Sequence, residues 1–264
     1  MELNEVLNHV EVKNYKNGKP CNFRKLLEKA DAGHFKAMYD FVRTVQYNNL
    51  ADDDPEDEIA KRQVRFMKKL AKIKGYSYMC IFVGEAYEKG SGVPKDINKA
   101  IKWFKNAAKG GIKFGNECAG MIYFNGNDLP VDYEKAYKYF TKDRCKKSFC
   151  TSYALGEMYR NGWYVEKDPD TAYSYYSDIV YNKPLYDKNG NNLDEIDDYF
   201  WRACYRAACA EHYGEGAEIH LGSALENLFK AMQLREDRTE KAKDITWEEM
   251  KQEWMKLNKD AGWM

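Results

Sequence analysis

Three stretches of this sequence repeat one pattern at a constant spacing of 36 residues. The copies read GEAYEKGSGVPKDINKAIKWF from Gly84, GMIYFNGNDLPVDYEKAYKYF from Gly120 and GEMYRNGWYVEKDPDTAYSYY from Gly156. The same spacing relates four further sets of identical residues, which are Tyr87, Tyr123 and Tyr159; Gly90, Gly126 and Gly162; Asp96, Asp132 and Asp168; and Ala100, Ala136 and Ala172. A period of this length is typical of a stacked array of structural repeats, in which each unit buries its apolar face against its neighbours.

Each copy predicts two helices joined by a short loop. In the first copy, apolar residues recur at helical spacing from Met79 to Tyr87. Gly90 is expected to end this helix, because glycine readily takes the left-handed conformation that closes many helices. The carboxylate of Asp96 can then cap the second helix by accepting an early backbone N–H. The apolar residues of 97–107 share one face of that second helix, so neighbouring pairs are expected to stack.

A glycine lies inside the first predicted helix of every copy, at Gly84, Gly120 and Gly156. Glycine in a helix interior costs about 1 kcal/mol relative to alanine. Its recurrence therefore predicts a close approach between helices that a side chain would prevent. The small side chain of Ala100 leaves room for a large aromatic residue of the partner helix.

The stretch VGEAYEKGSGVPKDINKAIKWFKNAAKGG resembles the Sel-one-like repeat (SLR) family, which is tetratricopeptide-like. The family pattern is an Ala, Leu-Gly-x-x-Tyr, Gly-x-Gly-Val, an Asp, Lys-Ala, an aromatic pair and Ala-Ala-x-x-Gly. The second copy has NGNDLPVD and the third NGWYVEKD in place of the middle Gly-x-Gly, and both keep the Gly, Tyr, Asp and Ala frame. The resemblance implies an all-α fold, a right-handed α/α solenoid of antiparallel helix pairs.

Weaker versions of the pattern flank the three copies. FRKLLEKADAGHFKAMYDFV belongs to an early unit in which Asp40 and Phe41 replace Leu-Gly, and YFWRACYRAACAEHYGEGAEIHLGSALENLFKAM is an eroded later copy. A capping box, Thr246 to Glu249, opens a last amphipathic helix that can seal the array. The sequence thus predicts one continuous solenoid with an N-terminal extension at 1–22, a degenerate first repeat at 23–75, repeats at 76–111, 112–147 and 148–181, an insertion at 182–194, a degenerate repeat at 195–235 and a capping helix at 245–260.

The insertion at 182–194 carries Asn189 followed by Gly190, which is typical of a tight turn and predicts a small loop or hairpin. Its acidic and amide residues also fall at several positions of a calcium-binding loop. Asn192 stands where such a loop needs glycine, and no bidentate Glu closes it. An ordinary turn is therefore the preferred interpretation.

Motifs that carry chemistry are missing from the sequence. It has no phosphate-binding Gly-rich loop, no Gly-x-Ser-x-Gly and no His-Glu-x-x-His. The one cluster worth testing as a zinc site is Cys204, Cys209, His212 and His220. Cys204 lies five residues before Cys209 and points elsewhere on a helix, so cysteines acting as small apolar residues are preferred. We expect no cofactor, no metal and no catalysis.

A secreted branch of the family joins the two helices of each repeat by a disulfide and has been associated with penicillin binding. Here Cys80, Cys118 and Cys150 fall at different repeat positions, and the Ser-x-x-Lys of covalent β-lactam chemistry is missing because SGVPK is one residue too long. A hydrolase of this cysteine-rich type is therefore a less favoured alternative. The seven cysteines form no framework and the first residues do not resemble a secretory signal, so we expect a cytoplasmic protein.

The charges of the sequence balance, with 42 basic and 42 acidic residues, which argues against a nucleic-acid-binding protein. The sequence has no run of about 18 consecutive apolar residues, so no membrane span is expected. What remains is a binding surface, because the resemblance implies that the first helix of each repeat lines a concave face. The exposed inner positions would then be Tyr78, Ile81, Glu85, Glu88, Phe114, Glu117, Met121, Phe124, Tyr153, Glu157, Arg160 and Glu211.

Aromatic residues and Met beside carboxylates predict a groove for a partner protein or peptide that carries a basic segment. The function expected from this groove is that of a protein–protein interaction scaffold or adaptor. An alternative is a dedicated inhibitor or immunity-type protein that neutralises one toxin or effector. Some of these aromatic residues could equally belong to the core between repeats.

Overall fold

The computed structural model describes residues 12–50, 58–126, 128–142, 148–182, 198–236 and 245–262. These residues form twelve helices, and β pairing among them is confined to an isolated bridge between Lys13 and Pro20, so the predicted all-α fold is confirmed. Most of the insertion at 182–194, with its predicted turn and the calcium alternative, lies outside the described residues. The helices divide between two compact units, which we call unit 1 (residues 1–131) and unit 2 (residues 132–264).

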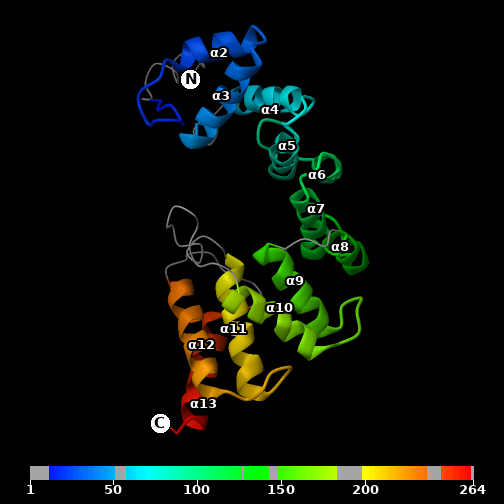
Figure 1. Ribbon diagram of the computed structural model, residues 1–264, viewed down its shortest axis with the longest axis vertical. Helices are drawn as coiled ribbons and strands as arrows, with labels where there is room; N and C mark the ends of the chain where they lie inside the picture. The colour runs from blue at the N-terminus through cyan, green and yellow to red at the C-terminus, as the bar shows by residue number, and fades with distance from the viewer. Residues whose placement is uncertain are drawn as a thin grey trace. The chain divides into compact units, whose positions relative to one another are not determined.

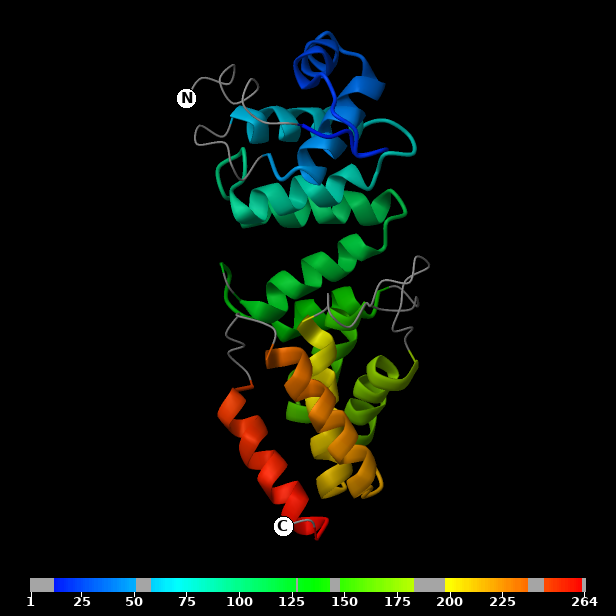
Figure 2. The same ribbon diagram turned by 90° about the vertical axis from the view of Figure 1, so that its left-hand side faces the viewer.

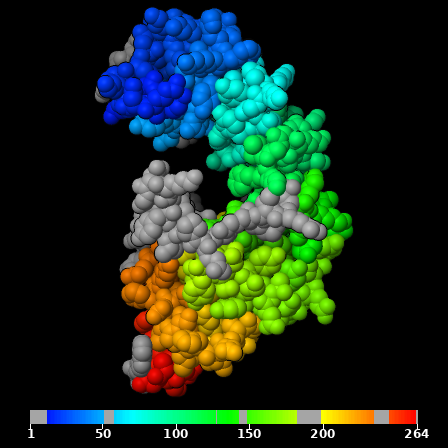
Figure 3. Space-filling model, viewed as in Figure 1, coloured from blue at the N-terminus to red at the C-terminus, as the bar shows by residue number. Residues whose placement is uncertain are grey.

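Unit 1 contains six described helices, each packed against the next one in the chain (Figure 1). They are α2 (Phe23–Asp31), α3 (Phe35–Tyr47), α4 (Glu58–Leu70), α5 (Met79–Lys89), α6 (Ile97–Lys109) and α7 (Phe114–Asn125). In the space-filling view the side chains of α2 to α4, in blue to cyan, form one packed body (Figure 3). Phe41 of α3 lies at its centre, stacked on Phe23 and edge-on to Phe66, and all three rings are buried.

Unit 2 also contains six described helices. They are α8 (Tyr133–Phe140), α9 (Phe149–Asn161), α10 (Pro169–Asn182), α11 (Asp198–Tyr213), α12 (Leu221–Glu236) and α13 (Trp247–Asp260). Trp201 of α11 is buried at the centre of this core, where α11 packs against α10 and α12. The last helix, α13, lies along α12 and buries Met250 and Leu257 (Figure 2).

The helix ends follow the signals of the sequence. Asp96 and Asp132 accept hydrogen bonds from the third backbone N–H of the helices that they precede, each at 2.9 Å. Asp168 does the same before α10, at 3.1 Å from the nitrogen of Thr171. Gly90, Gly126 and Gly162 end α5, α7 and α9 in the left-handed conformation. The capping box of Thr246 and Glu249 is present at the start of α13. These local predictions are confirmed.

The predicted close approach at the helical glycines is confirmed in both units. A Cβ added to Gly84 would lie 2.4 Å from Cε1 of Phe104, which α6 places against α5. A Cβ on Gly156 would lie 2.5 Å from Cε1 of Tyr176, which α10 places against α9. Real side chains do not come this close, so the aromatic ring of the second helix occupies the space that glycine leaves. Gly120 holds the equivalent position of α7 and is buried.

Candidate functional site

The predicted inner residues all lie on, or cap, the first helix of a pair: α5, α7, α9 and α11. Their exposure differs from the prediction at four positions. Ile81, Tyr153, Glu157 and Glu211 are buried, with between 3% and 6% of each residue exposed. These four residues were wrongly predicted to line an open face, and each has partners inside its own unit or packs into the core. The residues that stay at least partly exposed are Tyr78, Glu85, Glu88, Phe114, Glu117, Met121, Phe124 and Arg160.

Tyr153 belongs to the core of unit 2. Its ring lies 5.9 Å from that of Tyr176 on α10 and 5.7 Å from that of Tyr199 on α11. The alternative that some predicted aromatic residues are core is therefore correct here. Ile81 is also buried, within unit 1, because moving an apolar side chain out of water is favourable.

Glu157 is buried because a cation from another helix meets it. Nε and Nη2 of Arg206 donate to its two carboxylate oxygens at 2.8 and 3.1 Å, and the hydroxyl of Tyr176 donates to it at 2.7 Å. Burial, and then the charge of Glu157, raise the pKa of Tyr176, so that its phenol stays a neutral donor. This network joins α9, α10 and α11, and it cancels the charge that had been assigned to the groove.

Glu211 holds a second buried network. The hydroxyls of Tyr173 and Tyr181 donate to its Oε1 at 2.9 and 2.8 Å, and Nδ2 of Asn227 donates to its Oε2 at 3.0 Å. Three helices therefore converge on one carboxylate, which is satisfied by neutral donors. Glu211 positions helices and is not presented to a partner.

The first candidate binding surface is a row of aromatic rings in unit 1, which we call the aromatic ladder. It consists of Tyr15, Tyr39, Tyr76, Tyr78 and Phe82, all half-buried. Neighbouring rings along the ladder have centroids 6.2, 5.6, 6.2 and 6.3 Å apart. The ladder crosses from the segment before α2 over α3 to the start of α5, and only Tyr78 of this set was predicted.

A cavity of about 390 Å³ continues from Phe82 between α3, α4 and α5. Its walls combine apolar side chains such as Val64 and Met67 with the charged ends of Glu85 and Lys89. Burial raises the pKa of Glu85, and also that of Glu88 on the same helix. Ionised carboxylates are therefore poorly solvated here, which is the setting in which an incoming cation is most stabilised.

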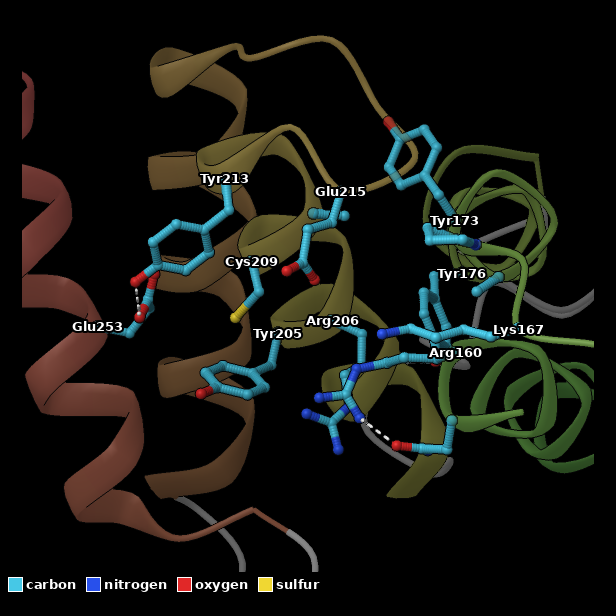
Figure 4. Close-up of a pocket in the computed structure, with 14 residues that line it drawn as sticks. Arg160, Lys167, Tyr173, Tyr176, Tyr205, Arg206, Cys209, Tyr213, Glu215 and Glu253 are labelled. Atoms are coloured by element: carbon cyan, nitrogen blue, oxygen red, sulfur yellow. Dashed lines mark hydrogen bonds between the residues drawn. The ribbon is translucent and has the colours of Figure 1, made fainter. Parts of the chain in front are cut away.

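The second candidate surface is a cavity of about 490 Å³ inside unit 2, which we call the tyrosine cavity. Figure 4 shows its walls: Tyr173 and Tyr176 come from α10, Tyr205 from α11 and Tyr213 from the end of α11. Arg160, Lys167 and Arg206 point into it from α9, the loop after α9 and α11 (Figure 4). Of the predicted residues, Arg160 alone lines this cavity.

The wall that α13 contributes to the tyrosine cavity is fixed by His212. Its Nδ1 lies 2.7 Å from Oε1 of Glu253, and its Nε2 lies 2.9 Å from Oδ2 of Asp260. The hydroxyl of Tyr213 donates to the other oxygen of Glu253 at 2.8 Å. These contacts tie α13 to α11.

The residues weighed for zinc do not come together as a metal site. Both ring nitrogens of His212 are occupied by carboxylates, and Cys204 is completely buried on α11. Burial, followed by the charge of Glu253, raises the pKa of the Cys209 thiol to about 12, so it is not a ready thiolate ligand. Within the described ranges, no group of three metal-ligating side chains is positioned to hold an ion.

The family model of the Sel1 repeat matches residues 77–112, 117–142, 152–177 and 201–234. The chain carries four Sel1 repeats. Along the sequence they follow α5 with α6, α7 with α8, α9 with α10 and α11 with α12. The resemblance read from the three clear copies is confirmed, and the eroded later copy matches as well.

Two solved structures share the fold of this Sel1-repeat chain. One is a protective antigen present in uropathogenic Escherichia coli strains and displaying an SLR fold, with a TM-score of 0.54 and 18% identity. The match covers 92% of this chain but 57% of the antigen. The other is a Sel1 repeat protein from Oxalobacter formigenes, with a TM-score of 0.54, 21% identity, and coverage of 80% of this chain and 85% of that one. No curated protein is similar enough to count as a match.

Both solved structures support the α/α-solenoid fold, and their low identity carries no further argument about function. Across the helices described, none is long and apolar enough to cross a membrane.

Sequence reasoning missed Arg206 and the tyrosines around it. A signal was present, because Arg206 interrupts the run ACYRAACA, whose other members include the buried Ala203, Cys204, Ala207 and Ala208. A charge inside an apolar helical run predicts a buried partner of opposite sign. The sequence does not indicate which residue that partner is, because Glu157 lies 49 residues before Arg206 and meets it only through the packing of α9 against α11.

Proposed function

We propose that this Sel1-repeat chain is a scaffold that binds a partner protein or peptide through the aromatic ladder of unit 1, without catalysis of its own. The observation that carries the proposal is the ladder itself: five half-buried rings in mutual contact at the surface of one unit. Rigid aromatic side chains bury a large area for little loss of side-chain entropy, and they are enriched at the centres of protein interfaces.

The surroundings of the ladder favour a polar as well as an apolar contact. Arg43 lies over the ring of Tyr15, with its guanidinium carbon 5.8 Å from the centroid, and Asp40 accepts from the hydroxyl of Tyr15 at 2.9 Å. At the other end, Glu85 lies in the cavity beside Phe82. A basic side chain of the partner would form a favourable pair with Glu85, because burial disfavours that carboxylate when it is alone. We therefore retain a basic segment as the chemistry of the partner.

A site-specific photo-crosslinking experiment tests the proposal. A benzophenone amino acid replaces Tyr78 or Phe82 of the ladder in separate variants, which are expressed in the cells that produce the protein. Matched controls carry it at Lys102 or Lys105, which are exposed on α6. We expect one and the same protein to be crosslinked from both ladder positions and from neither control position.

The same crosslinked proteins from all four positions, or none from the ladder, would contradict the proposal. Tyr78→Ala with Phe82→Ala should also abolish capture. Because both half-buried rings pack against the core of unit 1, circular dichroism of the variant checks that it still folds.

A further inference from the structure

The tyrosine cavity of unit 2 differs in charge from the ladder. Three cationic side chains line it, Arg160, Lys167 and Arg206. Arg206 is largely committed, because its Nε and Nη2 donate to the buried carboxylate of Glu157. The positive charge of Arg206 and the negative charge of Glu157 therefore offset each other, and this pair adds no net charge to the cavity.

The other two cations are held weakly. The guanidinium of Arg160 forms a long ion pair with Glu157 at 3.7 Å, beyond hydrogen-bond distance, and donates to the neutral amide oxygen of Asn161 at 3.3 Å. Its side chain is 40% exposed. Lys167 is exposed and forms no ion pair with any residue in the described part of the chain. Both therefore have donors available for a ligand.

The two acidic residues of the cavity wall, Glu253 and Glu215, form no ion pair with these two cations among the described residues. Glu253, on α13, already accepts from Tyr213 and contacts His212. Glu215 is exposed in the turn after α11 and forms no ion pair within the described residues. The phenols of Tyr173, Tyr176 and Tyr205 stay neutral, because burial raises their pKa values, so they add rings and no charge to the walls.

From this arrangement we propose that the tyrosine cavity binds an acidic side chain of a partner peptide, whose carboxylate is held by Arg160 and Lys167 and whose neighbouring apolar residue packs on the tyrosine rings. A guanidinium offers paired donors that match a carboxylate, and an ammonium adds a second charge. Aromatic walls exclude water and strengthen both contacts. The volume, about 490 Å³, falls within the roughly 300–1,000 Å³ of known ligand sites. The inference rests on the proposed scaffold function and assigns unit 2 its own part of the partner.

The test is selection from a displayed library of random dodecapeptides against the full chain at low salt. The library presents internal segments without a free carboxyl terminus, so any shared carboxylate belongs to a side chain. We expect the selected peptides to share an Asp or Glu beside an apolar residue. Synthetic, amidated versions are then titrated by fluorescence anisotropy against the full chain and its variants.

The decisive variant is Arg160→Gln with Lys167→Gln. We expect it to weaken the acidic peptides about tenfold, the scale of losing charged contacts in a partly dry site. The matched control, Lys102→Gln with Lys105→Gln, removes the same charge from exposed positions of α6 and should change affinity less than about twofold. Both variants should retain the melting temperature of the parent, because the buried pair of Glu157 and Arg206 is untouched.

Selected peptides without a shared acid, or acidic peptides that bind the Arg160 and Lys167 variant as tightly as the parent, would overturn the inference. A selection that yields no peptide whose binding depends on Arg160 and Lys167 would also overturn the inference. A parallel selection on Tyr78→Ala with Phe82→Ala separates the two proposals. Peptides lost there but kept by the cavity variant would support the ladder and refute the cavity, whereas the reverse result would refute the ladder alone.

Discussion

Replacing Gly156 by Ala should destabilise unit 2, although alanine is the better helix former. The substitution gains about 1 kcal/mol of helix propensity. The new Cβ, however, would lie 2.5 Å from Cε1, 2.9 Å from Cζ and 3.0 Å from Cδ1 of Tyr176. That ring is 2% exposed, so it has no free space to enter.

The magnitude follows from three contributions. Overpacking a core costs about 1–3 kcal/mol. Moving the ring also stretches the hydrogen bond from the Tyr176 hydroxyl to Glu157, which costs about 1 kcal/mol more. After subtraction of the helix propensity, we expect Gly156→Ala to lower the free energy of unfolding by about 2 kcal/mol. Urea titration followed by circular dichroism measures this difference.

Gly222 provides the matched control in the same unit. It is also helical, on α12, but a Cβ there would meet nothing closer than Cε1 of His220 at 3.6 Å. Gly222→Ala should therefore leave stability unchanged or raise it by up to about 1 kcal/mol. Combining Gly156→Ala with Tyr176→Leu should cost less than the sum of the two single changes, because the clash is gone. Equal stability of Gly156→Ala and Gly222→Ala would refute the close approach that organises the repeat.

Three further predictions concern charged and reactive groups. Glu85→Gln should raise the urea midpoint at pH 7, because burial raises the folded-state pKa of Glu85 and its ionised form opposes folding. This gain in stability should shrink as the pH falls through the folded-state pKa toward 4.5. A gain that does not depend on pH would contradict burial as its cause. Arg206→Met should cost about 3–5 kcal/mol, because the buried Glu157 loses the cation that donates to both of its oxygens. Adding Glu157→Gln should restore part of that loss in the same urea titration, whereas additive losses would argue against the pair. Iodoacetamide at pH 8 should modify Cys209 about a thousandfold more slowly in the folded than in the unfolded chain, because the folded structure raises the pKa of its thiol to about 12. Site-resolved mass spectrometry measures the two rates, and labelling at equal rates would contradict the raised pKa.

Local features of this fold could be predicted from the sequence because each depends on neighbours in the chain. Asp96 accepts from the backbone N–H of Lys99, three residues further on, and Gly90 ends the helix that it follows. The helical glycines were informative for a different reason. An unfavourable residue that recurs at one position indicates a tertiary constraint, and the rings of Phe104 and Tyr176 are that constraint.

The exposure of the inner helices could not be predicted in the same way. Helical spacing places Glu157 and Glu85 at equivalent repeat positions, but Glu157 meets Arg206 and is buried, while Glu85 stays partly exposed in a cavity. The difference comes from residues distant in sequence that do not follow the repeat. The ladder was likewise missed, because its rings follow no repeat period: Tyr15 and Tyr76 lie in turns or loops, and Tyr39 lies on α3, in the degenerate first repeat.

The central claim is that the partner binds the aromatic ladder of unit 1, on α3, residues 76–78 and α5. Hydrogen–deuterium exchange of the full chain, alone and with the partner captured from Tyr78, tests it most directly. We predict slower exchange in α3, in residues 76–78 and in α5 when the partner is bound, with exchange in α4 and α6 unchanged. Protection confined to α4 and α6, with α3 and α5 exchanging as in the free chain, would contradict the claim.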